Sequence, residues 1–370
     1  MFEGLLNNLK DEIKTIRSII NISEKLREII ADNPSQLNTE DLKYLQANAP
    51  LGDKWLVNDH CSSITRLYAL YENFVENLVG DWIILLPQLY SCYQDLPESV
   101  RNKHQTGCAT LLGNENKRNR FDSLSERDII KNLFDTEYKN TTKYNLTSAA
   151  FLLHEANLRK DQLTRLLVDA GISATDSWQW IENHKKVKNF IDNNSRGSVE
   201  NELKNFIELR NNSAHGKEID TVLNANELLQ LCDFVEAICQ AMSELVLYCF
   251  VDRKKKIGKL QKLGEIVNWY QQKKACAIKI SDEPQEPNKR LEVGKKVFLV
   301  SENKKICQNA IIESIQINKN GKNTPRRRIP IREIKDSEIG LKFDKESQKG
   351  LEVYLGLAEK VIEKYRSLNQ

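Results

Sequence analysis

Apolar residues recur at helical spacing through most of the first 250 residues. From Phe2 to about Asn48 this spacing predicts one or two amphipathic helices, interrupted near Asp32–Ser35. Ser62–Leu86 contains a strongly amphipathic pattern, whose apolar face carries Leu67, Leu70, Phe74 and Leu78. The longest apolar stripe lies in Asn224–Val251, and we expect it to form the core of a helical bundle or a dimer seam.

Further helices are predicted between these two patterns, each bounded by polar turn residues, at Ser99–Leu112, Ser125–Tyr138, Ser148–Leu158, Lys160–Asp169 and Asp176–Ile191. Asn114–Arg120 reads as a loop, whose three cations either contact RNA or face solvent. Leu158–Trp178 outlines a small helix-turn-helix with Gly171 at the turn. Because no basic recognition helix is evident in it, DNA binding is a weak alternative.

The pattern changes from helix to strand in the last third of the chain. A second helical segment is predicted around Leu263–Tyr270, and Asp282–Asn288 has the composition of a linker. Beyond it, short alternating runs with Gly-containing turns predict a small antiparallel barrel. These runs are Lys296–Val300, Ala310–Ile317, Glu338–Phe343 and Glu352–Leu355.

These patterns predict a mainly α protein, a helical bundle with extra helices, plus a small C-terminal antiparallel β-barrel. We expect four parts: an N-terminal helical extension (1–60), a helical domain (61–280), the barrel (288–357) and a C-terminal helix (358–370). With 370 residues, 40% of them hydrophobic, the chain is long enough to bury one large core or two modest ones.

Composition indicates a cytoplasmic protein without a membrane partner. The longest apolar run, Leu245–Val251, is far too short to cross a bilayer, and the N-terminus lacks the regions of a signal peptide. Eight scattered cysteines form no CxxC pair and no cluster with histidine, which argues against a disulfide framework and against structural zinc. We therefore expect neither a metal nor a cofactor.

Charge is distributed unevenly along the chain. Residues 1–250 carry 27 Lys and Arg against 36 Asp and Glu, whereas residues 251–370 carry 28 against 16. The C-terminal third is thus the basic end, which indicates contact with nucleic acid, although a solvated lysine-rich face is the commoner explanation of any single basic run. Candidate RNA contacts are Lys254, Lys255, Lys256, Arg326, Arg327 and Arg328. Trp269 and Tyr270, next to Lys273 and Lys274, offer a possible stacking surface for RNA.

Candidate chemistry gathers in Glu208–Gly216. Arg210 is a permanent cation whose planar fork matches phosphate oxygens, and His215 carries the side chain best suited to proton transfer near neutral pH. On an unbroken helix the two would point about 140° apart. We expect Asn211–Ser213 and Gly216 to end the preceding helix, so that His215 can turn back towards Arg210. Alternatively, both residues merely cap the last carbonyls of that helix.

The spacing of Arg210, Asn211 and His215 resembles the R-x(4–6)-H signature of HEPN nucleases, in which Asn commonly follows the Arg. Arg66–Leu78 is similar to the opening helix of the RiboL-PSP and MAE-type members. The resemblance implies a metal-independent endoribonuclease that leaves a 2′,3′-cyclic phosphate and a 5′-hydroxyl. It implies His215 as general acid or base, Arg210 as the group that stabilises developing charge, and Asn211 as an orienting residue. Glu72 and Arg66 either brace Arg210 or form exposed ion pairs. HEPN nucleases commonly act as homodimers, in which two motifs face one cleft.

The barrel carries a second resemblance. Ile312–Asn318, Ile339–Phe343 and Lys349–Tyr354 are similar to the domain-2 barrel of translational GTPases, but no GTP-binding loop accompanies them. Such a barrel would serve as a docking module for RNA or for a ribosome-associated target.

The HEPN resemblance favours a toxin or antiphage-defence effector with RNA as substrate and with an antitoxin or regulatory protein as a further partner. Two alternatives remain open. One is a catalytically silent HEPN module that binds RNA or protein, and the other is a translation-associated RNA-binding adaptor led by the barrel.

Overall fold

The computed structural model of the chain describes residues 2–32, 39–121, 124–137, 144–154, 156–172, 174–194, 196–214, 221–280, 290–319, 322–334 and 338–355. The chain divides into two compact units, Phe2–Ser243 and Glu244–Gln370. We call them the helical unit and the barrel unit. The predicted fold class, a mainly helical chain with a C-terminal antiparallel barrel, is confirmed.

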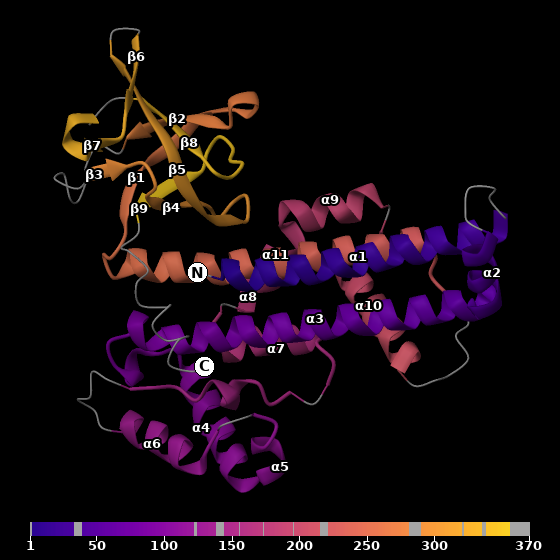
Figure 1. The fold of residues 1–370 in the computed structure, drawn as a ribbon. Coiled ribbons are helices and arrows are strands. Elements are labelled where there is room, and N and C mark those ends of the chain that lie inside the picture. The colour runs from indigo at the N-terminus through magenta and orange to yellow at the C-terminus, as the bar shows by residue number, and fades with distance from the viewer. Residues whose placement is uncertain are drawn as a thin grey trace. The chain divides into compact units, whose positions relative to one another are not determined.

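The longest helices of the chain are α1, α3 and α11, and the last residues of α11 belong to the barrel unit (Figure 1). The α-helices are α1 (Glu3–Asp32), α2 (Thr39–Asn48), α3 (Gly52–Leu89), α4 (Glu98–Gly113), α5 (Glu115–Arg118), α6 (Glu126–Glu137), α7 (Lys160–Asp169), α8 (Ala174–Asn183), α9 (Lys185–Asn193), α10 (Val199–Ala214) and α11 (Ala225–Lys256). Short 3-10 turns lie at Tyr93–Asp95 and Ser148–Phe151.

Helix α3 is the centre of this unit. Its apolar face, predicted from the spacing of Leu67, Leu70, Phe74 and Leu78, is buried. Helices α1 and α10 pack along it, and the rings of Tyr68 and Tyr71 lie 5.9 and 6.2 Å from that of Phe206 on α10. Aromatic pairs at such separations stabilise a core beyond the area that they bury.

Helix α1 is fixed to the bundle by charge as well as by its apolar stripe. Arg17 donates to Asp233 at 2.5 Å and to Glu236 at 3.1 Å, both on the part of α11 that belongs to the helical unit. Burial opposes the charge of Arg17, yet its pKa is raised because the two carboxylates offset that effect. The first 32 residues are therefore packed against the same bundle as α3.

Helix α4 approaches the turn at Ser148–Phe151 closely enough to require a glycine. A Cβ atom added at Gly107 would come within 2.2 Å of the Ala150 carbonyl oxygen. His104, one turn earlier, is fully buried. Its Nε2 accepts a hydrogen bond from the Thr147 N–H at 3.0 Å, and its ring stacks on Phe151. Burial lowers the pKa of His104 to about 4, so the imidazole is neutral in the folded protein at neutral pH.

Helix α11 is long and apolar enough to cross a membrane by length and composition, with a mean hydropathy of 1.6 over its most apolar 18 residues. The expectation that no segment approaches a membrane span is wrong on that measure. However, 72% of that window is buried inside the protein, as is typical of a core helix. It contributes buried residues such as Phe234, Val235 and Met242.

The barrel unit contains a sheet that closes on itself. Its strands are β1 (Gln261–Tyr270), β2 (Ala275–Ile280), β3 (Arg290–Glu292), β4 (Lys296–Ser301), β5 (Ile306–Lys319), β6 (Lys322–Arg326), β7 (Arg328–Pro330), β8 (Glu338–Phe343) and β9 (Glu352–Leu355). The order is β4-β9-β1-β2-β8-β5, with β5 pairing back to β4, and β6 extends β5 as a hairpin. Strands β3 and β7 form a separate pair.

The prediction of a helix around Leu263–Tyr270 is wrong, because this segment is strand β1. Two register shifts, between Lys262 and Gly264 and between Ile266 and Asn268, break the alternation that marks a strand in a sequence. Gly264 is required at the first shift, since a Cβ atom there would lie 2.0 Å from the Lys279 carbonyl oxygen. The predicted helical domain therefore gives way to barrel strands from Gln261 onwards.

Other predicted boundaries differ in detail. Asp176–Ile191 is not one helix, because the extended backbone of His184 separates α8 from α9. Asn114–Arg120 is not a simple loop, because Asn114 caps the short helix α5. Four parts of these predictions lie outside the described residues: Tyr138, the interruption at Asn33–Ser35, the linker Asp282–Asn288 and the final helix at 358–370.

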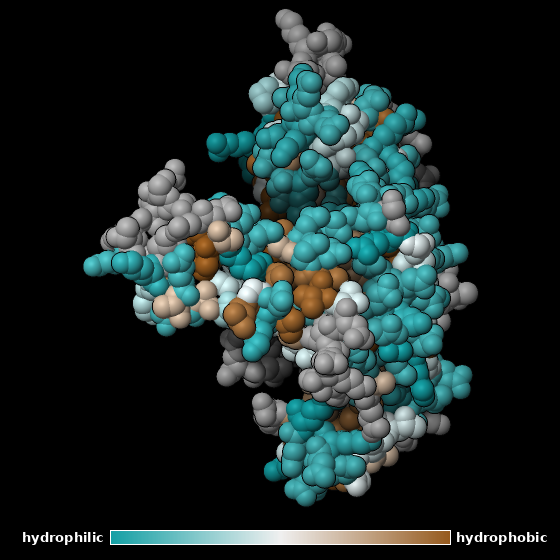
Figure 2. Space-filling model, turned by 90° about the vertical axis from the view of Figure 1, so that its right-hand side faces the viewer, coloured by the Kyte–Doolittle hydropathy of each residue, from teal (hydrophilic) through white to brown (hydrophobic). Residues whose placement is uncertain are grey.

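The surface visible in Figure 2 is mainly hydrophilic, with one area where hydrophobic side chains gather. The described residues also include large apolar side chains that are exposed, such as Ile19 and Ile22 on α1 and Phe134 on α6. Isolated exposed apolar residues are common on soluble proteins.

We predict that part of the free energy of unfolding is lost between pH 6.5 and pH 4 through His104. Unfolded His104 takes up a proton near pH 6.5, whereas folded His104 resists protonation until about pH 4, so stability is present above this window and falls as the pH decreases through it. The contribution of this residue is about 3 kcal/mol at most. Urea unfolding at pH 7.0, 5.5 and 4.5 measures it, with His104→Gln as the comparison. An equally steep loss in both proteins would contradict the assignment.

Candidate functional site

Arg210 lies in the last turn and a half of α10, and the helix continues through Asn211, Asn212 and Ser213 to Ala214. The prediction that Asn211–Ser213 end the helix is therefore wrong. These polar residues remain helical because their side chains have other partners: the Ser213 hydroxyl donates back to the Leu209 carbonyl at 2.8 Å, and the Asn211 amide is engaged at the site. His215 and Gly216 lie outside the described residues, so the spacing of Arg210 and His215 in space stays a prediction.

The guanidinium of Arg210 is held by two elements that are distant in sequence. Its carbon Cζ lies 4.6 Å from the centre of the Tyr68 ring on α3, a cation–π contact. One terminal nitrogen donates to Asn157 Oδ1 at 3.2 Å and to Asn211 Oδ1 at 3.1 Å. Asn157 in turn donates to Asn211 Oδ1 at 2.8 Å. The orientation of Arg210 is thus fixed from below by a ring and from one side by two amides.

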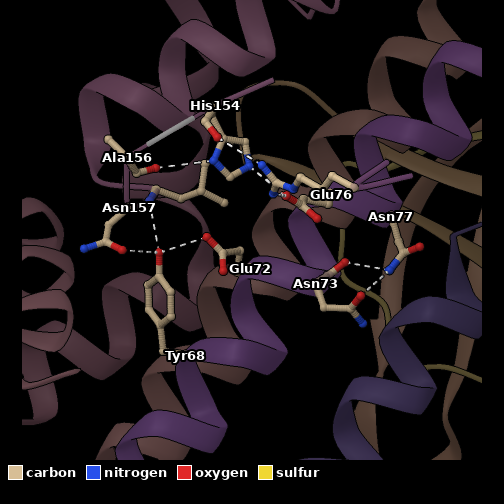
Figure 3. Close-up of polar contacts among 10 residues, drawn as sticks. Tyr68, Glu72, Asn73, Glu76, Asn77, His154, Ala156 and Asn157 are labelled. Atoms are coloured by element: carbon tan, nitrogen blue, oxygen red, sulfur yellow. Dashed lines mark hydrogen bonds and ion pairs between the residues drawn. The ribbon is translucent and has the colours of Figure 1, made fainter. Parts of the chain in front are cut away.

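The Tyr68 hydroxyl joins this group to Glu72. It lies 3.1 Å from Asn157 Oδ1 and 3.3 Å from Glu72 Oε1, and it accepts a hydrogen bond from the Leu158 N–H (Figure 3). Burial, together with the nearby charge of Glu72, raises the pKa of Tyr68 to about 12. The phenol therefore remains protonated at neutral pH and can act as a hydrogen-bond donor within the network.

Within the described residues, Arg210 has donors that no hydrogen bond uses and that could bind an anion. Among the residues that the structure describes, its recorded hydrogen bonds use one terminal nitrogen only, and no carboxylate pairs with it. Arg210, Asn211, Asn157 and Glu72 are all partly exposed, whereas Tyr68 beneath them is buried. A guanidinium that is oriented on one side and open on the other is suited to binding phosphate oxygens.

A second polar cluster lies one turn further along α3. Glu76 Oε1 is 2.8 Å from His154 Nε2 and 2.7 Å from a terminal nitrogen of Arg120, and Arg120 also donates to the His154 carbonyl at 3.2 Å. Sequence analysis missed His154 and Glu76 because Ser148–Leu158 was predicted to be a helix. In the structure Ser148–Phe151 is a 3-10 turn, and residues 152–154 and 156–159 have no regular secondary structure.

The two predicted supporting residues differ in their placement. Glu72 belongs to the network through Tyr68. Arg66 does not contact it: its side chain is 57% exposed and pairs with Glu12 on α1 at 2.5 Å. Arg66 therefore has the role of an exposed ion pair, which contributes little to stability.

A model of the RiboL-PSP-HEPN family matches residues 7–248, which include most of α1 and most of α11. The chain belongs to this family. No curated protein and no solved structure gives a match. The similarity of the barrel to domain 2 of translational GTPases stays a hypothesis, since what is shown is a closed antiparallel barrel.

The residues of the Arg210 network lie within the range that the family model matches. Other histidines of the matched region are structural. His60 is buried and accepts a hydrogen bond from the Leu223 N–H at 2.9 Å, and burial lowers its pKa. His104 is neutral in the core, as described above. His184 is also buried, and His154 pairs with Glu76. His215 lies outside the described residues, so its role in a HEPN signature stays a prediction.

The predicted basic contacts of the barrel unit differ in exposure and pairing. Arg326, Arg327 and Arg328 are exposed, and within the described part of the chain no ion pair engages them. They line a shallow groove of about 770 Å³ together with Glu292 and Glu313. These arginines are thus available for contact with a polyanion, although two carboxylates share their groove.

The three lysines at the end of α11 are more engaged. Lys254 lies over Phe250 at 5.5 Å and Lys255 over Tyr354 at 4.9 Å, while Lys256 pairs with Asp252 at 2.7 Å. Burial lowers the pKa of Lys254. At the tip of the β1–β2 hairpin, Tyr270 is 52% exposed. The helix end therefore packs its lysines on aromatic rings and offers fewer free cations than the arginine groove.

No group of three or more His, Cys, Asp or Glu residues is close enough to hold a metal ion within the described ranges. All eight cysteines are free. Burial raises the pKa of several of their thiols, including Cys108 to about 11 and Cys232 to about 12. These thiols are therefore poor nucleophiles and poor metal ligands.

We predict that Tyr68→Phe lowers the free energy of unfolding by about 1–3 kcal/mol. The ring under Arg210 is retained, but the Leu158 N–H loses its partner, and Asn157 and Glu72 each lose one contact. Urea unfolding at pH 7 measures the change. Tyr44→Phe is the matched control, because Tyr44 is 68% exposed, and its change should stay below about 0.5 kcal/mol. Equal effects of the two substitutions would contradict the network.

Proposed function

We propose that the chain is a metal-independent endoribonuclease that cleaves RNA at a HEPN site built around Arg210, Asn211 and His215. The observation that supports it most is the Arg210 guanidinium, which is oriented by Tyr68 and Asn157 and has donors left for an anion. The family assignment supports an RNA-related role for the same unit.

The reaction that fits these residues is an internal transesterification. The ribose 2′-oxygen attacks the adjacent phosphorus as its proton passes to a base, and the bond from phosphorus to the 5′-oxygen breaks as an acid protonates that oxygen. The products are a 2′,3′-cyclic phosphate and a 5′-hydroxyl. In this proposal His215 serves as general acid or base, and Arg210 binds the phosphate oxygens on which negative charge develops.

Asn211 has a more specific role in this proposal than the sequence suggested. Its Oδ1 accepts hydrogen bonds from Arg210 and from Asn157, so it holds the guanidinium in place. One arginine and one histidine form a sparse site, because one imidazole cannot remove the first proton and donate the second in a single step. We therefore propose a symmetric homodimer in which two motifs face one cleft.

The proposal extends to the biological setting that the resemblance implied: a toxin or antiphage-defence effector that acts in the cytoplasm and is held in check by an antitoxin or another regulatory protein. The alternative is a silent HEPN module that binds RNA without cutting it. Cleavage assays separate the two, because a silent module has no activity for Arg210 substitutions to remove.

We predict that Arg210→Ala lowers the rate of RNA cleavage in EDTA by about 100-fold or more, because the transition state loses its charge partner. Arg210→Lys should recover little, since an ammonium keeps the charge but lacks the planar fork and stacks poorly on Tyr68. The measurement is the initial rate on a labelled RNA, with growth arrest of a bacterial host as a second readout.

Arg66→Ala is the matched control for these substitutions. It removes an arginine on the same helix as Tyr68, but one that pairs with Glu12 and does not touch the network. It should cut RNA and arrest growth as the wild type does. Wild-type rates in a folded Arg210→Ala protein would refute the proposed role of Arg210.

We further propose that Arg326, Arg327 and Arg328 bind the phosphates of the RNA substrate. We predict that replacing all three with Gln weakens RNA binding and makes the slope of log affinity against log salt shallower by about 2, since each phosphate contact on single-stranded RNA contributes about 0.7. The matched control replaces Lys185, Lys186 and Lys188, three exposed lysines on α9, with Gln. The same loss in both proteins would indicate an effect of net charge and would contradict a specific groove.

A further inference from the structure

The segment between the 3-10 turn at Ser148–Phe151 and helix α7 contacts α3 at Glu76, Tyr71 and Tyr68, and it supplies Asn157 to the Arg210 site. We call its described residues His154, Ala156, Asn157 and Leu158 the strap. Figure 3 shows the strap on one side and the side chains of α3 on the other, with polar contacts between them. Because the strap is irregular, its backbone is held by side chains and not by a helical hydrogen-bond ladder.

One end of the strap is fixed at the Arg210 site. The Leu158 N–H donates to the Tyr68 hydroxyl at 3.3 Å, and the Leu158 carbonyl accepts from the buried Tyr71 hydroxyl at 2.9 Å. Asn157, the preceding residue, contacts Arg210, Asn211 and Tyr68. The position of Asn157 therefore decides how the guanidinium is oriented.

The other end is fixed by the cluster of Glu76, His154 and Arg120. Glu76 Oε1 faces His154 Nε2 at 2.8 Å, and His154 Nδ1 lies 3.3 Å from the Ala156 carbonyl oxygen. Both of these partners are acceptors, so the His154 ring is held between a carboxylate of α3 and the backbone of its own strap. Arg120 completes a closed ring, because it donates to the same Glu76 oxygen and to the His154 carbonyl.

The contact between Glu76 and His154 is partly shielded from solvent. The His154 side chain is only 9% exposed and that of Glu76 24% exposed, so solvent screens their interaction less than it screens a surface pair. The hydrogen bond from Arg120 to Glu76 is charge-assisted, and such bonds are shorter and stronger than neutral ones. They anchor a segment whose other end orients Arg210.

We propose that Glu76, His154 and Arg120 act as positioning residues for RNA cleavage: they clamp the strap so that Asn157 holds Arg210 in its productive orientation. The claim that the clamp supports RNA cleavage, its catalytic part, rests on the proposed function. The claim that the clamp holds the strap in place, its mechanical part, does not. The clamp makes no contact with substrate and acts through Asn157. Its loss therefore leaves Arg210 present but misoriented.

The mechanical part is tested by amide hydrogen exchange of Leu158, measured by NMR. Glu76→Ala should speed exchange of this amide by about tenfold or more, because the strap opens more often when the clamp is lost. Glu76→Gln keeps an acceptor oxygen and should give an intermediate rate. Asn77→Ala is the matched control, since Asn77 neighbours Glu76 and, in the part of the chain that the structure describes, hydrogen-bonds to Asn73 on the same helix. Unchanged exchange in both Glu76 variants would overturn the clamp.

The catalytic part is tested by a double-mutant cycle with Arg210. Glu76→Ala should lower kcat by about 10- to 100-fold with little change in KM, because the misplaced group acts on the transition state. In an Arg210→Ala background the same substitution should have no further effect, since there is no guanidinium left to orient. Losses that multiply in the double variant would show that Glu76 acts independently of Arg210 and would overturn the proposal.

The two levels of failure are distinguishable. If Arg210→Ala cuts RNA as the wild type does, the proposed function fails, and Leu158 exchange still reports on the clamp. If Glu76→Ala does not fold, Glu76→Gln provides both the exchange and the kinetic measurement. A folded Glu76→Gln protein with wild-type exchange and wild-type kcat would refute the clamp.

Discussion

The contact between the Arg210 guanidinium and the face of Tyr68 is the interaction on which the candidate site depends. Tyr68 is buried against Phe206, so its ring is a rigid surface in the core between α3 and α10. Its hydroxyl binds the strap and faces Glu72, and the strap returns Asn157 to Arg210. The packing of α3 against α10 therefore also positions the ring on which the Arg210 guanidinium lies. A flexible arginine would lose more conformational entropy on binding a phosphate than one that is already held.

The same helix supports two polar clusters because side chains four residues apart lie on one face. Tyr68, Glu72 and Glu76 follow this spacing along α3. The first two belong to the Arg210 network and the third to the clamp, and the strap connects them. This arrangement connects Glu76 to the side chains that orient Arg210, although Glu76 is not one of the Arg210 contacts.

The sequence predicted those features that depend on local patterns. The apolar face of α3, the existence of α10 and α11 and four of the barrel strands all follow from periodicity. The partners of Arg210 did not, since Tyr68 and Asn157 come from segments 142 and 53 residues away in the chain, and no spacing rule connects them. The strap was predicted to be helical because its residues have no strong helix-breaking pattern. In the folded protein, the Leu158 N–H donates to the Tyr68 hydroxyl and the Leu158 carbonyl accepts from the Tyr71 hydroxyl, in place of the hydrogen bonds of a helix. Strand β1 was missed because two bulges hide its alternation.

The central claim is that this HEPN chain cleaves RNA without a metal ion through Arg210 and His215. The most direct measurement is incubation of the purified protein with total cellular RNA in EDTA, the wild type beside His215→Ala, with chemical mapping of the new ends. The account predicts discrete cuts with 2′,3′-cyclic phosphate and 5′-hydroxyl ends from the wild type only. Intact RNA in both samples, or the same cuts from folded His215→Ala, would contradict it.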